Sequence, residues 1–353
     1  MSLALTPLTA LYGALVRARL ALYRSGALAA RGAGVPVVSV GNLTAGGTGK
    51  TPLVGWVARA LAAEGRRVCV LTRGYGRANE RKRVVVSDGA RLLAEAREGG
   101  DEPRLLAEQL LGAASVVSDA DRVVAARWAV EVLGSDAFVL DDGFQHLRLA
   151  RELDVVTLDA TDPWGGGRLL PSGRLREPRE GLARAGCVVI TRADLAADLE
   201  HLRAEAARLT GGRAPVLTSR LRTSAVRPLA PAPEPDGHEG CGDDDACAAF
   251  CAIGNPRAFF AHLRGDGLEP VHTRAFPDHH AYKQSDLDAL SREAAGRGAR
   301  RLLTTAKDAV KLRGLSFALP CHVVHVEPEI EDEDVLLGLL RQAVARHAGG
   351  DSR

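Results

Sequence analysis

The sequence has 353 residues, of which 46% are hydrophobic and 25% charged, and its formal net charge is +2. A chain of this length and hydrophobicity can bury a large core and is long enough for two globular domains. The small net charge argues against a protein that binds nucleic acid through a global positive field, so nucleic acid is not an expected partner.

The six cysteines form no recognisable framework. None belongs to a C-x-x-C pair, and only Cys241, Cys247 and Cys251 lie near one another in the sequence. These three could bind a metal, but an incidental cluster is the favoured interpretation. Because the N-terminal segment does not follow the pattern of an export signal, we expect the reduced thiols of a cytosolic protein.

Residues 1–34 carry the pattern of a basic amphipathic helix. Five apolar residues share one sector of the helical wheel: Leu8, Leu11, Tyr12, Leu15 and Leu22. Arg17 and Arg24 lie on the opposite side. The apolar runs are shorter than the roughly 20 residues that span a bilayer. Two interpretations stay open: the helix lies on a membrane surface, with Arg19 reaching the headgroups, or it packs on the core of its own domain.

A phosphate-binding loop is predicted between two regular elements. Residues 35–40 are an apolar, β-branched run typical of a strand, and residues 53–61 show a helical pattern. Six residues between them are candidates for nucleotide binding: Gly46, Gly47, Thr48, Gly49, Lys50 and Thr51. The pattern G-x-x-x-x-G-K-[ST] is only half met, because Thr44 stands where its first glycine belongs.

These residue types suit a nucleoside triphosphate. Glycines let backbone N–H groups point at phosphate oxygens, and the N-terminus of the following helix adds its dipole. Lys50 would reach the β- and γ-phosphates, and the Thr51 hydroxyl would bind Mg²⁺. An ordinary strand-to-helix loop is the competing interpretation, which the flanking strand and helix disfavour.

Residues 137–146, AFVLDDGFQH, give a second nucleotide signal. An apolar strand that ends in Asp141 and Asp142, about 90 residues after the lysine, is the Walker B arrangement, in which an aspartate holds Mg²⁺. Apolar runs at residues 66–72, 154–159 and 187–190 alternate with helical segments. This alternation predicts an α/β fold with a mostly parallel sheet covered on both faces.

Two loops supply further candidates. Residues 73–77, RGYGR, follow the strand at 66–72, and arginines in a loop at that end of a strand suit an anion or a substrate. Asp101 and Glu102 stand at the start of a predicted helix, residues 103–111, where simple N-terminal capping is an equally good explanation.

Seven sequence blocks in a fixed order resemble one known family. They are GNLTAGGTGKTP, RGYG, GDEP, DDGFQH, LPSGRLREP, FPDHH and TTAKDAVKL. In these blocks the chain is similar to tetraacyldisaccharide 4'-kinase of lipid A biosynthesis. The resemblance implies two α/β/α sandwich domains joined by a short β linker. It also implies transfer of the γ-phosphate of ATP, with Mg²⁺, to the 4'-hydroxyl of a lipid A disaccharide 1-phosphate. The enzyme would be peripheral or monotopic at the cytoplasmic face of the inner membrane.

The resemblance extends to individual residues. Lys50 and Thr51 would bind the phosphates and Mg²⁺, and Asp141 and Asp142 would serve the metal. Seven other residues are candidate substrate contacts: Arg73, Tyr75, Arg77, Glu102, Arg122, His146 and Glu177. Surface charge, helix capping or loop packing is the competing interpretation for these seven.

Asp101 matches the family's catalytic aspartate, which would act with His279 of the FPDHH block. A sugar hydroxyl is a poor nucleophile, and an imidazole supported by a carboxylate can take its proton. His280 is the neighbouring candidate, but its side chain would point elsewhere if the segment is extended.

Four segments are expected: a membrane-associating helix at 1–34, a P-loop kinase domain at 35–215, a linker or flexible insertion at 216–247, and a smaller α/β domain at 248–353. Because Lys50 and His279 fall in different domains, a cleft between the domains is expected. The TTAKDAVKL block departs from the family, which has glutamate at the position of Ala306. Any role of that glutamate is therefore not carried over.

Two rival functions would have no lipid substrate. Thr191-Arg192-Ala193-Asp194 imitates the guanine-reading [NT]-K-x-D motif of a P-loop GTPase switch, but it has arginine in place of lysine. A membrane-recruited ATPase of the partitioning type would need a second lysine early in the phosphate loop, and residues 44–48 contain none. The kinase is the favoured function.

Overall fold

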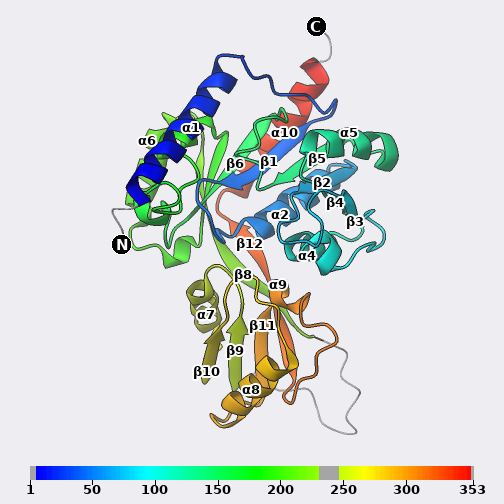
Figure 1. Cartoon of the computed structure of the whole chain (residues 1–353), viewed down its shortest axis with the longest axis vertical. Coiled ribbons are helices and arrows are strands. Elements are labelled where there is room, and N and C mark those ends of the chain that lie inside the picture. Colours follow the sequence, from blue (N-terminus) through cyan, green and yellow to red (C-terminus); the bar gives the residue numbers. More distant parts are fainter. Residues whose placement is uncertain (1–4, 230–245, 351–353) are drawn as a thin grey trace. The chain divides into compact units, whose positions relative to one another are not determined.

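The computed structural model describes residues 5–229 and 246–350. The chain forms two compact units (Figure 1). The first unit consists of Met1–Arg220 and Pro328–Arg353, and the second of Leu221–Glu327. Cys241 and half of the predicted insertion, residues 230–245, lie outside the described residues.

The first unit is built on a mostly parallel sheet with the strand order β8-β7-β6-β1-β5-β2-β4-β3. The strands are β1 (Val37–Asn42), β2 (Val68–Thr72), β3 (Val84–Ser87), β4 (Ala114–Ser118), β5 (Ala137–Asp141), β6 (Leu153–Asp159), β7 (Cys187–Thr191) and β8 (Val216–Pro228). Within this strand order of the described residues, β3 pairs with β4 in antiparallel direction and the other pairs are parallel. Strands in the middle of such a sheet are covered on both faces, which explains their continuous apolar runs.

Helices cover both faces of this sheet. The longer ones are α1 (Thr6–Arg24), α2 (Lys50–Ala63), α4 (Asp101–Gln109), α5 (Arg122–Leu133), α6 (Leu199–Thr210) and α10 (Glu333–Gly350). Short ones are α3 (Ala96–Gly99) and the 3₁₀ turns η2 (Gly165–Gly167), η3 (Arg179–Arg184) and η4 (Ala193–Leu195). Val38 and Val40 pack with α2, α4 and α10, whereas Val37 packs with α5 on the other face. The expected α/β class is confirmed.

The second unit is a smaller α/β/α sandwich. Its parallel strands are β9 (Cys247–Cys251), β10 (His272–Ala275), β11 (Arg301–Thr305) and β12 (Cys321–Ile330), in the order β10-β9-β11-β12. Its helices are α7 (Pro256–Gly265), α8 (Gln284–Ala295) and the short α9 (Ala306–Ala309). Leu287 and Leu290 of α8 pack on one face of the sheet, and Phe260 and Leu263 of α7 pack on the other.

The boundaries differ from the sequence-based expectation in two places. Residues 216–228, expected as linker, form strand β8, which with β12 carries the chain between the units. The last helix, expected in the smaller domain, belongs to the first unit, because Leu336, Leu340 and Ala343 of α10 enter the core formed by β1, β5 and α2. Sequence periodicity identifies a helix but not the sheet on which it packs.

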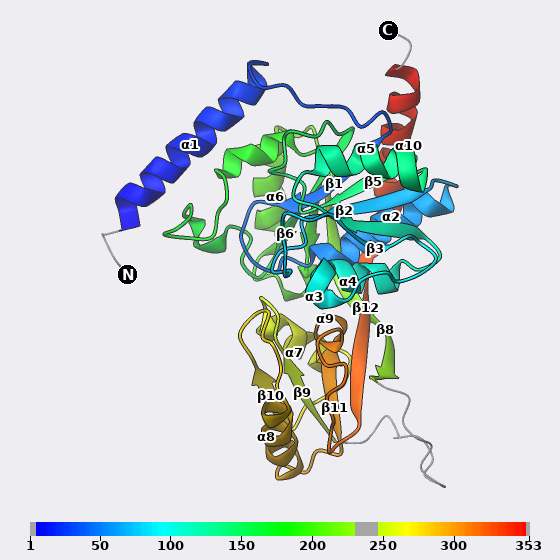
Figure 2. The same cartoon turned by 45° about the vertical axis from the view of Figure 1, so that its right-hand side comes forward.

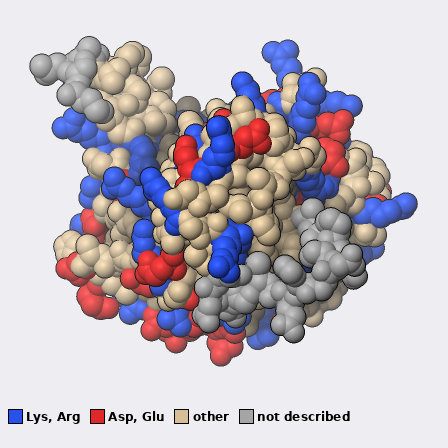
Figure 3. All heavy atoms as spheres, turned by 90° about the horizontal axis from the view of Figure 1, so that it is seen from below, with Lys and Arg blue, Asp and Glu red and all other residues tan. Residues whose placement is uncertain are grey.

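The helix α1 lies along the outside of the first unit (Figure 2). It is partly buried along one stripe and exposes large leucines on another. No helix of the described residues is long and apolar enough to cross a membrane. On the face drawn in Figure 3, basic and acidic side chains are interspersed, in line with the small net charge.

Candidate functional site

The two predicted nucleotide motifs meet at the carboxyl ends of the strands in the sheet of the first unit. Six parallel strands end there, with their last residues at Asn42, Thr72, Ser118, Asp141, Asp159 and Thr191. In an open α/β sheet, ligands bind outside the carboxyl ends of the strands. The phosphate loop leaves from the end of β1, which lies between β5 and β6.

Lys50 is fixed at the start of α2 by two neighbours. Its Nζ donates to Asn42 Oδ1 at 3.1 Å and lies 3.4 Å from Asp142 Oδ1. The residue before it, Gly49, has φ = 73°, a left-handed conformation that glycine adopts without strain. The expected strand, glycine turn and helix are therefore present, and the lysine lies beside the second motif.

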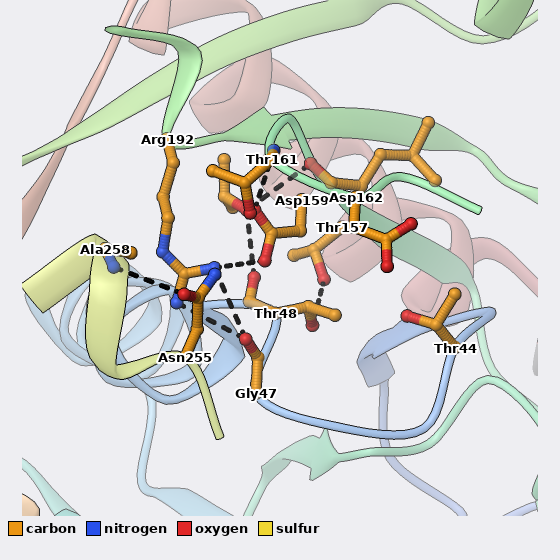
Figure 4. A network of polar contacts seen from close by, with 12 residues as sticks. Thr44, Gly47, Thr48, Thr157, Asp159, Thr161, Asp162, Arg192, Asn255 and Ala258 are labelled. Carbon is orange, nitrogen blue, oxygen red and sulfur yellow. Dashed lines mark hydrogen bonds and ion pairs between the residues drawn. The ribbon is translucent and has the colours of Figure 1, made fainter. Parts of the chain in front are cut away.

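Strands β6 and β7 brace the phosphate loop from one side (Figure 4). Thr191 Oγ1 donates to the carbonyl oxygen of Thr48 at 2.9 Å, and the Arg192 guanidinium donates to that of Gly47 at 3.3 Å. Arg192 also forms an ion pair with Asp159, and both side chains are largely buried. The arginine that imitates the GTPase lysine thus holds the loop's backbone, a role that sequence reasoning did not assign.

The LPSGRLREP block lies along the other side of the phosphate loop. Arg176 N–H donates to the carbonyl oxygen of Leu43 at 2.8 Å, and Ala45 N–H donates to that of Arg174 at 2.7 Å. The Arg176 guanidinium donates to Asp142 Oδ2 at 2.6 Å. Sequence reasoning quoted this block but missed Arg176, and its membership of a matching block was the available signal.

Asp141 and Asp142 are neighbours in sequence with opposite pKa shifts. Burial, helped by the negative charges of Glu102 and Asp142, raises the pKa of Asp141 to about 7. Burial acts in the same direction on Asp142, but the charges of Lys50 and Arg176 outweigh it and lower the pKa to about 2. Asp142 is thus ionised and paired. Asp141 is a buried carboxyl group near two other negative charges, and a bound cation would favour its ionised form.

Replacing Asp141 with asparagine should stabilise the free protein at pH 8 and abolish its activity. The raised pKa means that between about pH 4 and 7 the native state holds a proton that the unfolded chain has released, so stability falls as pH rises through this window. We expect the variant to gain on the order of 2 kcal/mol at pH 8 in the presence of a chelator. Urea unfolding at pH 5 and pH 8 measures this, and an equal change at both values would contradict the assignment.

The donor set at these strand ends fits Mg²⁺. Magnesium prefers oxygen ligands and usually keeps several waters, with one or two carboxylates from the protein. Thr51 supplies a hydroxyl in the first turn of α2, and Asp141 supplies a buried carboxylate. Within residues 5–229 and 246–350, no three His, Cys, Asp or Glu side chains are arranged to hold a metal, and Cys247 and Cys251 are buried within β9.

The RGYG and GDEP blocks are tied to the end of β4. Arg77 donates to the carbonyl oxygen of Ser118 at 2.8 Å, and Ser118 Oγ donates to that of Gly99 at 2.7 Å. Asp101 follows directly as the first residue of α4. Arg77 is buried and also donates to the backbone carbonyl oxygen of Glu80, so its guanidinium holds the loop together. Arg73 and Tyr75 are exposed in the same loop.

Arg122 and Glu177, for which surface charge was the competing interpretation, are buried, and His146 is half-buried. Burial lowers the pKa of Arg122, while Asp141 and Asp142 counter this shift. Burial, followed by the charge of Arg122, lowers the pKa of His146 to about 4. Glu177 is 1% exposed. Its carboxylate accepts from Gln145 at 2.8 Å and pairs with Arg184 at 2.8 Å, which makes Glu177 a buried packing element.

The second unit carries the FPDHH block in a turn. His279 has φ = 60°, and its backbone N–H donates to Asp278 Oδ1 at 3.0 Å. Lys307 Nζ lies 3.4 Å from the same carboxylate oxygen. His280 bonds Asp286 at 2.9 Å and stacks on Phe276. The segment is a turn and not an extended strand, and His280 has a partner of its own.

Asp308 of the TTAKDAVKL block is fully buried. Its carboxylate accepts hydrogen bonds from Ala252 N–H at 3.0 Å and from the Tyr282 hydroxyl at 3.1 Å, and it pairs with Lys311. Asp308 therefore holds β9, β11 and the segment before α8 together. Lys307 and Asp308 follow Ala306 in this block. Lys307 contacts Asp278 of the histidine turn, whereas Asp308 has the buried partners just named.

Comparison with known proteins agrees with this geometry. A family model described as LpxK, tetraacyldisaccharide-1-P 4'-kinase, matches residues 1–345. The tetraacyldisaccharide 4'-kinase of Anaeromyxobacter sp. (strain Fw109-5) is 48% identical over 342 residues, which cover 95% of this chain and 90% of that protein. The one from Geobacter sulfurreducens is 43% identical over 334 residues, with coverages of 90% and 86%.

A solved structure extends the similarity to three dimensions. LpxK from Aquifex aeolicus, crystallised in complex with ATP, superposes with a TM-score of 0.74 at 30% identity, covering 97% of this chain and 98% of that one. The family model, the curated relatives and the solved structure all name the same enzyme, in agreement with the resemblance carried by the seven sequence blocks. The chain belongs to the tetraacyldisaccharide-1-P 4'-kinase family.

Proposed function

We propose that this protein transfers the γ-phosphate of ATP to the 4'-hydroxyl of a tetraacyldisaccharide 1-phosphate. Family membership supports the reaction. The main structural support for the location of the site is that Lys50 lies between Asn42 and Asp142 at the carboxyl ends of the strands. The backbone of Gly46–Gly49 and the N-terminus of α2 bind the phosphates, and Lys50 contacts their outer oxygens. Thr51 and Asp141, with Asp142 beside them, would hold Mg²⁺, whose charge would offset that of the phosphates.

Two residues prepare the hydroxyl. The imidazole of His279 takes the proton of the 4'-hydroxyl as its oxygen bonds to the γ-phosphorus, and the bond from that phosphorus to the β–γ bridging oxygen breaks, releasing ADP. Asp101 supports the proton transfer. Arg73 and Tyr75, which are exposed in the RGYG loop, are proposed to contact the sugar 1-phosphate. Arg77 and Glu177, which are buried and bonded to other parts of the first unit, are proposed to act as supports of the site. Arg122 and His146 stay candidate substrate contacts.

The test is transfer of label from γ-labelled ATP to the lipid in detergent micelles. Tetraacyldisaccharide 1-phosphate should become labelled, and the same lipid without a free 4'-hydroxyl should not. Hydrolysis of ATP with neither lipid labelled would contradict the kinase and favour a nucleotide switch. Equal labelling of both lipids would contradict the 4'-position as the acceptor.

We further propose that α1 docks the enzyme peripherally on the inner membrane, at its cytoplasmic face, where an acceptor with four acyl chains resides. Four large leucines of the helix are between 45% and 62% exposed: Leu8, Leu11, Leu15 and Leu22. They share the apolar sector of the helical wheel, while the arginines beside them suit anionic headgroups. The adjacent stripe of α1 packs on its own unit, so one helix can contact both the protein and the membrane.

Replacing Leu11 and Leu15 together with serine should weaken binding to anionic vesicles by about 10-fold or more, because each leucine loses its apolar burial in the acyl boundary. Co-sedimentation with vesicles measures this. The matched control replaces Leu93 and Val132, which are exposed elsewhere on the first unit, with serine. Equal weakening in both pairs would contradict a docking role for α1.

A further inference from the structure

The inner stripe of α1 contacts two segments that surround the phosphate loop. Tyr12 hydroxyl donates to the carbonyl oxygen of Arg176 at 2.7 Å, and Arg19 donates to that of Gln145 at 3.1 Å. Thr9 Oγ1 lies 2.6 Å from Ser172 Oγ. At Gly13, a Cβ atom would stand 2.9 Å from Leu169 Cδ1, so a larger residue would require the leucine side chain to shift.

The contact through Arg176 leads to Lys50 in two further steps. The Arg176 guanidinium donates to Asp142 Oδ2 at 2.6 Å, and Asp142 Oδ1 lies 3.4 Å from Lys50 Nζ. The Arg176 N–H also holds Leu43, at the start of the phosphate loop. Burial raises the pKa of Tyr12, so its hydroxyl stays protonated and able to donate.

The contact through Gln145 ends at the same lysine. Gln145 Nε2 donates to the carbonyl oxygen of Asn42 at 2.9 Å, and Asn42 Oδ1 accepts from Lys50 Nζ at 3.1 Å. Two residues of α1 are therefore connected to the two neighbours of Lys50. Tyr12 is connected to Asp142 through Arg176, and Arg19 is connected to Asn42 through Gln145. Such a contiguous set of hydrogen bonds and ion pairs is a physical route for coupling between sites.

We propose that Tyr12 and Arg19 are positioning residues that couple a lipid surface bound by α1 to the geometry of Lys50 and Asp142. The proposal rests on the membrane-docking role of α1. When the leucine stripe is seated on lipid, the helix is held still, and Arg176 and Gln145 are fixed with it. The phosphate loop is then ordered for ATP at the surface where the lipid acceptor is found.

The test compares Tyr12→Phe with Tyr23→Phe in the full chain. Both variants remove one hydroxyl from α1 and keep the ring, and the Tyr23 ring lies beneath Arg19, where phenylalanine preserves the stacking. Tyr12→Phe should lower kcat/KM for ATP about 2- to 10-fold, the effect of one lost hydrogen bond, with unchanged binding to anionic vesicles. Tyr23→Phe should match the wild type in both measurements.

A second comparison isolates the coupling. The KM for ATP should be lower for wild type on anionic vesicles than in micelles, and Tyr12→Phe and Arg19→Gln should reduce that difference while Arg24→Gln retains it. Kinetics of Tyr12→Phe equal to those of Tyr23→Phe would overturn the proposal, as would a loss of activity strictly parallel to a loss of vesicle binding. If the leucine-to-serine variant binds vesicles like wild type, the docking role of α1 is contradicted. The kinetics of Tyr12→Phe in micelles then still show whether the contact from Tyr12 through Arg176 affects Lys50.

Discussion

Replacing Lys50 with methionine should lower kcat for phosphate transfer by about 10²- to 10³-fold. The reaction develops charge on the transferred phosphoryl group, and catalysis depends on positioned cations more than on covalent chemistry. Lys50 is the cation whose Nζ already lies between Asn42 and Asp142. Methionine keeps the length of the side chain but removes its charge. Steady-state transfer to the lipid and equilibrium binding of ATP measure the effect.

The matched control is Lys50→Arg, which retains a positive charge. A guanidinium is planar and larger than an ammonium, so this variant should recover only part of the activity. Thermal unfolding of both variants shows whether Asp142 is still held by Arg176. Wild-type turnover in Lys50→Met would contradict a phosphate-binding role for this loop.

Replacing Asp101 with asparagine or His279 with glutamine should each lower kcat by about 10²- to 10⁴-fold, the usual range for loss of a general base. If the two residues act as a unit, the double variant should be no slower than the slower single variant, because paired catalytic groups are not additive. ATP binding should persist, since neither residue belongs to the phosphate loop. Transfer kinetics over a range of pH should also lose the limb that reports the base in the His279 variant.

His280→Gln is the matched control for this pair. His280 bonds Asp286 and stacks on Phe276, so its replacement should affect stability more than turnover. A large loss of kcat with His280→Gln and little loss with His279→Gln would contradict the assignment of the proton transfer to His279. It would show that His280 takes the proton. Additive effects of the Asp101 and His279 variants would show two independent roles.

The local elements of the site could be predicted from the sequence. The apolar run before Asn42, the glycine turn and the carboxylates after Leu140 specify strands and loops through patterns a few residues long, and the structure has β1, α2 and β5 where those patterns stand. The family resemblance was equally readable, because it depends on the order of short blocks. The conformation of the FPDHH segment could not be predicted from the sequence, since the left-handed turn at His279 depends on the packing around it.

What only the tertiary structure decided is which distant residues share a surface. Arg192 holding Gly47, Arg176 pairing with Asp142, and Tyr12 reaching Arg176 all join positions far apart in the chain. The same holds for α10, whose leucines pack in the first unit although the helix follows the second. Periodicity and motif spacing report local conformation and chemistry, whereas the partner of a side chain is fixed by strand order and by the packing of whole elements. The sequence by itself therefore determined the fold class, the family and the nucleotide motifs, and the tertiary structure determined how the N-terminal helix, the arginines and the carboxylates are connected to one another.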